Sequence, residues 1–181
     1  MTKKTLYFDM DGVLAKYDYG LYIPNQEGQV PPFLKLGSHV FVDIEPEANV
    51  IKAFEKLYER YKGSKKVSIK ILTSIPVGLL QAEHTIDKFR WCTFHISLFD
   101  SNDFFCTSVP KHDAISDSLW TLTKDDILID DYNKNLDNWK AHGGTAIKCL
   151  NGINSKNENY DYIETTWSPD EIVKKLNWLL L

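Results

Sequence analysis

The chain has 181 residues, of which 43% are hydrophobic and 25% are charged, so we expect a single domain over residues 1–181 rather than a disordered chain or a disulfide-stapled miniprotein. With 25 acidic against 21 basic residues the net charge is -4, which disfavours a nucleic-acid polymer as the partner. A small phosphorylated ligand stays allowed, because a few local cations and backbone N–H groups can bind one phosphate whatever the net charge.

The cysteines and the apolar runs bear on cellular location. Cys92, Cys106 and Cys149 are odd in number and lack the spacing of zinc ligands, which favours reduced thiols and a cytoplasmic location. Asp9 interrupts the first apolar run too early for a signal peptide, and no stretch approaches the roughly 18 to 20 apolar residues of a membrane span. We therefore expect no membrane partner. The sequence leaves the oligomeric state open, a homodimer included.

Short apolar runs alternate with helical patterns along the chain, which is typical of a parallel sheet covered by helices. Five runs have the composition of strands buried on both faces, namely 5–9, 68–73, 103–106, 127–130 and 145–149. Apolar residues at helical spacing predict helices over 50–61, 78–94, 134–142 and from 168 to the end of the chain. The expected fold class is therefore α/β, a Rossmann-like parallel sheet of about five strands flanked by helices.

Local signals define the ends and faces of these helices. Gly63 follows the first helix as a C-terminal stop. The residues of the second helix that we expect to face the core are Leu79, Ala82, Ile86 and Phe89. In the last helix, Ser168 and Glu171 form a capping box around a proline at the first helical position, and Trp178 is expected to add apolar surface.

Two stretches fall outside this alternation, 16–43 and 151–166. The first follows the first strand directly and contains several glycines and prolines, with interleaved aromatics at Tyr17, Tyr19, Tyr22, Phe33 and Phe41. Long loops in compact domains are usually functional or disordered, and the aromatic content argues against disorder. We interpret residues 16–43 as a small cap insertion after the first strand.

Two carboxylates follow the first strand, in the order Asp9-Met-Asp11-Gly12. The carboxyl ends of strands are where open parallel sheets bind ligands. A buried carboxylate must be paired, bound to a metal or shifted in pKa, so an acid at this position is costly for packing alone. The alternative is that Asp9 caps a turn that Asp11 and Gly12 form.

A second acidic pair, Asp130 and Asp131, ends the strand 127–130. If neighbouring strands bring it close to Asp9 and Asp11, four carboxylates converge at one edge of the sheet. Mg²⁺, a hard cation with oxygen ligands, would neutralise them. The alternative is that Asp130 and Asp131 cap the following helix.

Hydroxyls and lysines could complete a site for an anion. Thr73 and Ser74 end another buried strand, where they could bind phosphate oxygens, although such residues before a proline are also ordinary loop chemistry. Lys111 and Lys88 are candidate cations, but most lysines are simply solvated. The five histidines show no ligand spacing, and we assign none a catalytic role.

Taken in order, these motifs resemble those of the haloacid dehalogenase-like phosphohydrolases over nearly the whole chain. The matching residues are Asp9-Met-Asp11-Gly12, Thr73, Lys111 and Asp130-Asp131. More narrowly, segments 9–15, 72–74 and 128–132 are similar to the 5'(3')-deoxyribonucleotidase family. The downstream matches to that family are Asn135, Leu136, Trp139, Gly143 and Gly144.

The resemblance implies a Mg²⁺-dependent phosphomonoesterase. Asp9 would attack the phosphorus and form an aspartyl-phosphate, while Asp11 would act as general acid and then as general base. Mg²⁺ would be held by the Asp9 carboxylate, the Asp11 carbonyl and Asp131, with Asp130 in support. The remaining residues would bind the substrate or its transferring oxygens: Thr73, Lys111, Gly12, Ser74 and Lys88.

The substrate implied by the narrower resemblance is a deoxyribonucleoside monophosphate, which would make the chain an enzyme of deoxyribonucleotide catabolism. Tyr17 lies where that family has an aromatic facing the base, and the other rings of the insertion could complete an apolar slot, or could simply pack. Tyr132 stands where many relatives have arginine. The alternatives are a phosphatase of the same chemistry acting on a sugar phosphate or another small metabolite, and a non-catalytic binding protein.

Overall fold

The computed structural model describes residues 3–18, 20, 29–35, 37, 39–116, 121–154 and 159–180. These ranges contain a six-stranded sheet in which every pairing is parallel. Its strands are β1 Lys4–Phe8, β2 Val67–Ser74, β3 Phe104–Thr107, β4 Asp126–Asp130, β5 Thr145–Leu150 and β6 Asp161–Glu164. The α/β class is confirmed, and the five expected strands are β1 to β5.

β6 corrects the expectation that residues 151–166 lie outside the layers. Ile163 is completely buried, whereas Asp161 and Tyr162 are exposed, so the strand buries little apolar surface and its sequence lacks a strand pattern. It pairs with β5 at the edge of the sheet. Backbone pairing with a neighbour decides the conformation here, and sequence composition does not show it.

The strand order is β3-β2-β1-β4-β5-β6. From β1 the chain builds β2 and β3 on one side, and then returns to place β4 on the other side of β1. The carboxyl ends of the strands that flank such a reversal are the usual ligand-binding position in open parallel sheets. β1 and β4 therefore present the residues that follow them at the same place.

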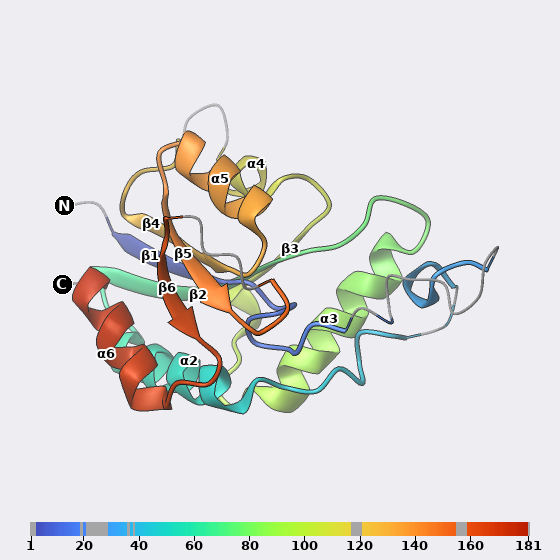
Figure 1. Cartoon of the computed structure of the whole chain (residues 1–181), viewed down its shortest axis with the longest axis horizontal. Helices are drawn as coiled ribbons and strands as arrows, with labels where there is room; N and C mark the ends of the chain where they lie inside the picture. The colour runs from blue at the N-terminus through green and yellow to red at the C-terminus, as the bar shows by residue number, and fades with distance from the viewer. Residues whose placement is uncertain are drawn as a thin grey trace.

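Helices cover both faces of the sheet, as Figure 1 shows with α2 and α6 on one side and α4 and α5 on the other. The helices are α2 Ala48–Tyr61, α3 Gln81–His95, α4 Lys111–Ile115, α5 Asn133–Ala141 and α6 Pro169–Leu180. Successive residues of a strand point to opposite faces. Leu6 and Phe8 of β1 consequently enter a core shared with α2, α3 and α6, and Tyr7 enters a second core with Leu136 and Trp139 of α5.

The prediction of which face of α3 is buried is wrong. Leu79 precedes the helix and is fully exposed, and Ala82, Ile86 and Phe89 are exposed as well. The buried residues are instead His84, Asp87, Lys88, Trp91 and Cys92. Polar residues occupy the inner face because Lys88 and Asp87 have partners there, and hydropathy alone cannot reveal such partners.

The last helix begins as expected, but one of its residues faces the other way. Ser168 Oγ and the Glu171 carboxylate are 2.6 Å apart, and the Ser168 N–H donates to the same carboxylate at 2.9 Å, which confirms the capping box. Trp178 is 72% exposed, so the apolar surface that it adds lies on the solvent side of the helix.

The described residues of the insertion 16–43 include a short 3-10 turn, η1 Pro32–Leu34. Phe41 is completely buried and meets the ring of His84 edge-on, with 5.1 Å between the ring centroids. The end of the insertion is therefore packed against α3. Tyr19 and Tyr22 lie outside the described residues. None of the helices in the described ranges combines the length and the hydropathy that crossing a bilayer requires.

Candidate active site

Asp9, Asp130 and Asp131 meet at the carboxyl ends of β1 and β4. Phe8 is in register with Ile129, and the Asp9 N–H donates to the Ile129 carbonyl at 2.9 Å. The residues that follow them, Asp9 and Asp130, therefore lie side by side. One carboxylate oxygen of each of the three acids lies within 4.8 Å of the other two. All three side chains are buried. Residues more than 120 positions apart thus form one acidic cluster.

Lys111 is the cation of this cluster. It is the first residue of α4, and its Nζ lies 2.7 Å from Asp9 Oδ1 and 2.6 Å from Asp130 Oδ2. Burial lowers the pKa of Lys111, but the charges of Asp130 and Asp9 outweigh this effect, so the pKa is raised and the ammonium is retained. Lys111 therefore pairs with two of the three acids, and the buried ammonium of Lys148 donates to the Asp131 carbonyl.

Asp130 has more partners than its neighbours in the cluster. Besides Lys111, it accepts hydrogen bonds from the Tyr132 N–H at 2.8 Å and from Asn135 Nδ2 at 3.0 Å. Burial and the charge of Asp9 raise its pKa, and Lys111 opposes them. With its oxygens already engaged, Asp130 orients the cluster.

Asp131 is held by two asparagines from the loop after β5. Asn151 Nδ2 and Asn154 Nδ2 donate to Asp131 Oδ2 at 2.8 Å and 2.7 Å. Burial and the charge of Asp130 raise its pKa to about 7. We did not anticipate either asparagine. The signal that could have found them is topological, because β5 neighbours β4 and its carboxyl-end loop must reach the same edge of the sheet.

Gly12 is required by the close approach of Asp131. Its φ is +76°, and a Cβ built there would lie 2.3 Å from Asp131 Oδ2. The Gly12 carbonyl also accepts a hydrogen bond from Asn151 Nδ2 at 3.0 Å. A side chain at this position would displace the Asp131 carboxylate, and the positive φ would strain any other residue.

Asp11 lies in the same cleft wall as Asp9 and Asp131, but its carboxylate is not part of the compact three-acid cluster. Its Oδ2 lies 2.5 Å from Lys88 Nζ, on the inner face of α3. Lys88 also donates to Thr73 Oγ1 at 2.9 Å and to the Ser74 carbonyl at 2.8 Å. Lys88 thus connects the end of β2 with Asp11.

A cleft of about 460 Å³ opens over these groups, with Asp9, Asp11, Ser74, Asp131 and Tyr17 in its wall. This volume suits a small ligand. Tyr132, which is 52% exposed, also borders it.

The aromatic slot expected from the insertion is only partly present. Phe41 is buried beneath the Lys88 ammonium and the His84 ring, and Phe33 packs against the core. Neither ring borders the cleft, so for Phe33 and Phe41 the packing alternative holds and not the base slot. Among the described aromatic residues of the insertion, Tyr17 alone is placed to touch a ligand.

Two solved structures are similar to this chain over nearly its whole length. One is a D,D-heptose 1,7-bisphosphate phosphatase from Burkholderia thailandensis, with a TM-score of 0.56 at 13% identity over 98% of this chain and 99% of that one. The other, from B. bronchiseptica, was solved with magnesium and phosphate and has a TM-score of 0.60 at 11% identity, over 97% and 98% of the two chains.

No protein-family model matches the sequence, and no curated protein is significantly similar to it. At these levels of identity the likeness establishes the fold. The chain therefore shares the parallel α/β fold of these two phosphatases.

Proposed function

We propose that this protein is a Mg²⁺-dependent phosphomonoesterase that acts on a small phosphorylated metabolite through an aspartyl-phosphate. One observation carries the proposal: Asp9 lies in the wall of the cleft, bound to Lys111, with Asp130 and Asp131 beside it. Three buried acids that two strands bring together are expensive for stability alone.

The acidic cluster fits a hard divalent cation. Its donors are carboxylate oxygens, and the pKa of Asp131 is raised to about 7 because burial and neighbouring acids disfavour its charge. A bound cation would favour the charged carboxylate and so lower the pKa of Asp131. Asp9 and Asp131 would hold Mg²⁺, with the Asp11 carbonyl as a third ligand and Asp130 in support. When bound, the ion would offset the repulsion between an anionic nucleophile and an anionic phosphate.

Asp9 is oriented for attack by two hydrogen bonds to the same oxygen. The Met10 N–H donates to Oδ1 at 2.7 Å, and Lys111 Nζ lies 2.7 Å from it. The other oxygen, Oδ2, would bond to phosphorus as the ester P–O bond breaks. Thr73, Lys111 and Lys88 would stabilise the charge on the transferring oxygens.

Asp11 would transfer the protons. In the first step it would protonate the leaving alkoxide, and in the second it would take a proton from the water that attacks the aspartyl-phosphate, releasing phosphate and free Asp9. Lys88 holds Asp11 in the cleft before substrate arrives. A bound phosphate would compete for Lys88 and free the Asp11 carboxyl for this role.

Two substrate classes remain, and we favour a sugar phosphate or similar metabolite. The similar solved structures are phosphatases of a sugar bisphosphate. The second candidate is a nucleoside monophosphate, with the deoxyribonucleotide as the form that the motifs suggest. Tyr17 supports it, because this ring borders the cleft where a base could stack.

A single domain with a cap at residues 16–43 and a cytoplasmic location are also part of the proposal. Tyr17 in the cleft wall and Phe41 against α3 support the cap. The three cysteines are free thiols, in keeping with a reducing compartment.

The first test is a phosphate-release screen over sugar phosphates and over ribo- and deoxyribonucleoside monophosphates, with Mg²⁺ or with a chelator. Asp9→Asn should abolish turnover while the circular dichroism spectrum stays unchanged, because an amide is not a nucleophile here. Asp170→Asn, a change at an exposed acid on α6, is the matched control and should keep full activity. Undiminished turnover by Asp9→Asn would falsify the nucleophile assignment.

The second test separates the substrate classes. Tyr17→Ala should reduce kcat/KM for nucleoside monophosphates about 5-fold or more, since an aromatic stacking contact contributes roughly 1–3 kcal/mol. It should change kcat/KM for para-nitrophenyl phosphate much less. Equal losses on both esters would contradict the stacking role of Tyr17 and leave the favoured class, a sugar phosphate.

A further inference from the structure

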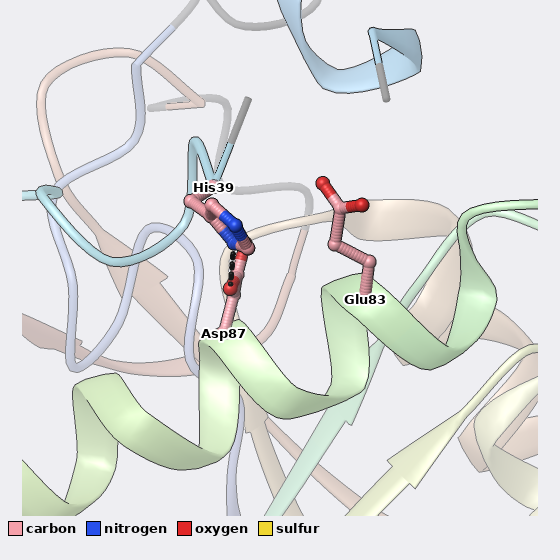
Figure 2. A group of neighbouring side chains, drawn as sticks. All are labelled: His39, Glu83 and Asp87. Atoms are coloured by element: carbon pink, nitrogen blue, oxygen red, sulfur yellow. Dashed lines mark hydrogen bonds and ion pairs between the residues drawn. The ribbon is translucent and has the colours of Figure 1, made fainter. Parts of the chain in front are cut away.

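A second group of metal-type side chains lies outside the cleft, between α3 and the insertion. Glu83 and Asp87 are one turn apart on α3, and His39 approaches them from the segment that follows η1, as Figure 2 shows. One ligand atom of each residue lies within 4.8 Å of the other two. The group therefore has the compactness that a single ion requires.

The protein contacts of this group leave two carboxylate oxygens unsatisfied. Asp87 Oδ1 lies 2.9 Å from His39 Nδ1, and Glu83 Oε2 accepts a hydrogen bond from the Gly37 N–H at 3.1 Å. Asp87 Oδ2 and Glu83 Oε1 are buried and have no hydrogen-bond partner among the described residues. The Asp87 side chain is completely buried. Buried carboxylate oxygens without partners are costly and call for a ligand.

No neighbouring lysine neutralises the pair within the described ranges. Lys88 follows Asp87 directly, but its ammonium points to Asp11, Thr73 and the Ser74 carbonyl. Acids one turn apart on a helix repel each other. His39 is the neighbouring group that can contribute to binding a cation, and its side chain is 54% exposed, so an ion can enter from solvent.

From this geometry we propose that His39, Glu83 and Asp87 form a second metal site, which binds Zn²⁺. One imidazole with two carboxylates is a borderline ligand set that suits zinc, whereas Mg²⁺ prefers oxygen ligands alone. The ion replaces the His39–Asp87 hydrogen bond and neutralises the two carboxylates. It joins the insertion to α3, the helix whose Lys88 contacts Asp11 in the cleft wall.

The test measures Zn²⁺ binding to the full chain by equilibrium dialysis and metal analysis, with excess Mg²⁺ present. The expected result is one equivalent of Zn²⁺ per chain and a rise in Tm on adding zinc. Co²⁺ in place of Zn²⁺ should give visible absorption bands of a low-symmetry site. His39→Ala and Glu83→Gln should each lose the zinc equivalent and the Tm rise.

Controls separate this site from the catalytic one. Glu59→Gln, an exposed change on α2, and Asp131→Asn should retain the zinc equivalent. Loss of binding in Asp131→Asn, or wild-type zinc binding by both His39→Ala and Glu83→Gln, would overturn the proposal. So would an absence of bound zinc in the wild type. If Glu83→Gln does not fold, His39→Ala decides alone, because its side chain is largely exposed. The outcome is independent of phosphatase activity.

Discussion

Two buried lysines form ion pairs with three of the acids in and beside the cleft. Lys111 contacts Asp9 and Asp130, and Lys88 contacts Asp11, so each cation is fixed by carboxylates from another element. A lysine in such a position cannot be lost without leaving buried charge uncompensated. Removing either lysine should therefore lower the free energy of unfolding much more than breaking a surface ion pair does.

Lys111→Met keeps the length of the side chain and removes its charge. We expect it to lower the free energy of unfolding by about 3–5 kcal/mol at neutral pH, since Asp9 and Asp130 are left without a cation. Lys56→Met is the matched control, because it breaks an exposed pair with Asp170 and should cost about 1 kcal/mol or less. Urea titrations with a chelator present would measure both. Similar small losses in the two variants would contradict the structural role of Lys111.

At the scale of elements, α3 shows how polar partners determine which face of a helix is buried. On its inner face Lys88 contacts Asp11 and Asp87 contacts His39. The buried apolar residues of the helix are Trp91 and Cys92. The indole N–H of Trp91 donates to the Ile44 carbonyl at 2.6 Å, which attaches the helix to the residue that follows the insertion. Ile86 and Phe89 are left on the outer side.

This orientation of α3 predicts opposite outcomes for two substitutions. Ile86→Gln should change the free energy of unfolding by less than about 0.5 kcal/mol, because Ile86 is 49% exposed. Trp91→Ala should cost about 3–5 kcal/mol, since a completely buried indole is removed. Thermal or urea unfolding would compare them. A large loss of stability in Ile86→Gln would instead support the burial of Ile86 that the apolar pattern predicted.

At the scale of the whole molecule, folding itself creates the acidic cluster. The reversal of strand order between β1 and β4 brings Asp9 beside Asp130 and Asp131, which are distant in the unfolded chain. The folded protein therefore carries a repulsion that the unfolded chain lacks. A bound divalent cation would remove it, so metal and pH should act on stability together.

The pKa of Asp131 sets the sign of this dependence. Its pKa is raised to about 7 in the folded state, whereas an unfolded aspartate has a pKa of about 3.9. Between these values the folded state binds more protons, so stability should fall as pH rises from about 4 to 7. The expected loss from this group is about 2–4 kcal/mol in metal-free protein.

Chemical denaturation from pH 4 to 8 would measure the effect. Asp131→Asn should flatten the slope, and Mg²⁺ at pH 7.5 should restore the stability of the wild type but not raise that of the variant. A wild-type slope that persists in Asp131→Asn would assign the titration to another group.

The sequence by itself determined the strands β1 to β5, the helices with clear periodicity and the residues at the carboxyl ends of β1, β2 and β4. These depend on local patterns, since apolar runs and turn residues act over a few positions. It also indicated Asp9, Asp11, Lys111 and Asp131 through their ordered motifs.

Only the tertiary structure decided which polar groups meet. Asn151 and Asn154 beside Asp131, Lys88 against Asp11, and His39 with Glu83 and Asp87 all join distant segments. The same contacts decided which face of α3 is buried, and pairing with β5 decided that 161–164 is a strand. The physical reason is that a buried charge or an edge strand is stabilised by its partner, and the partner is chosen by the packing of the whole chain.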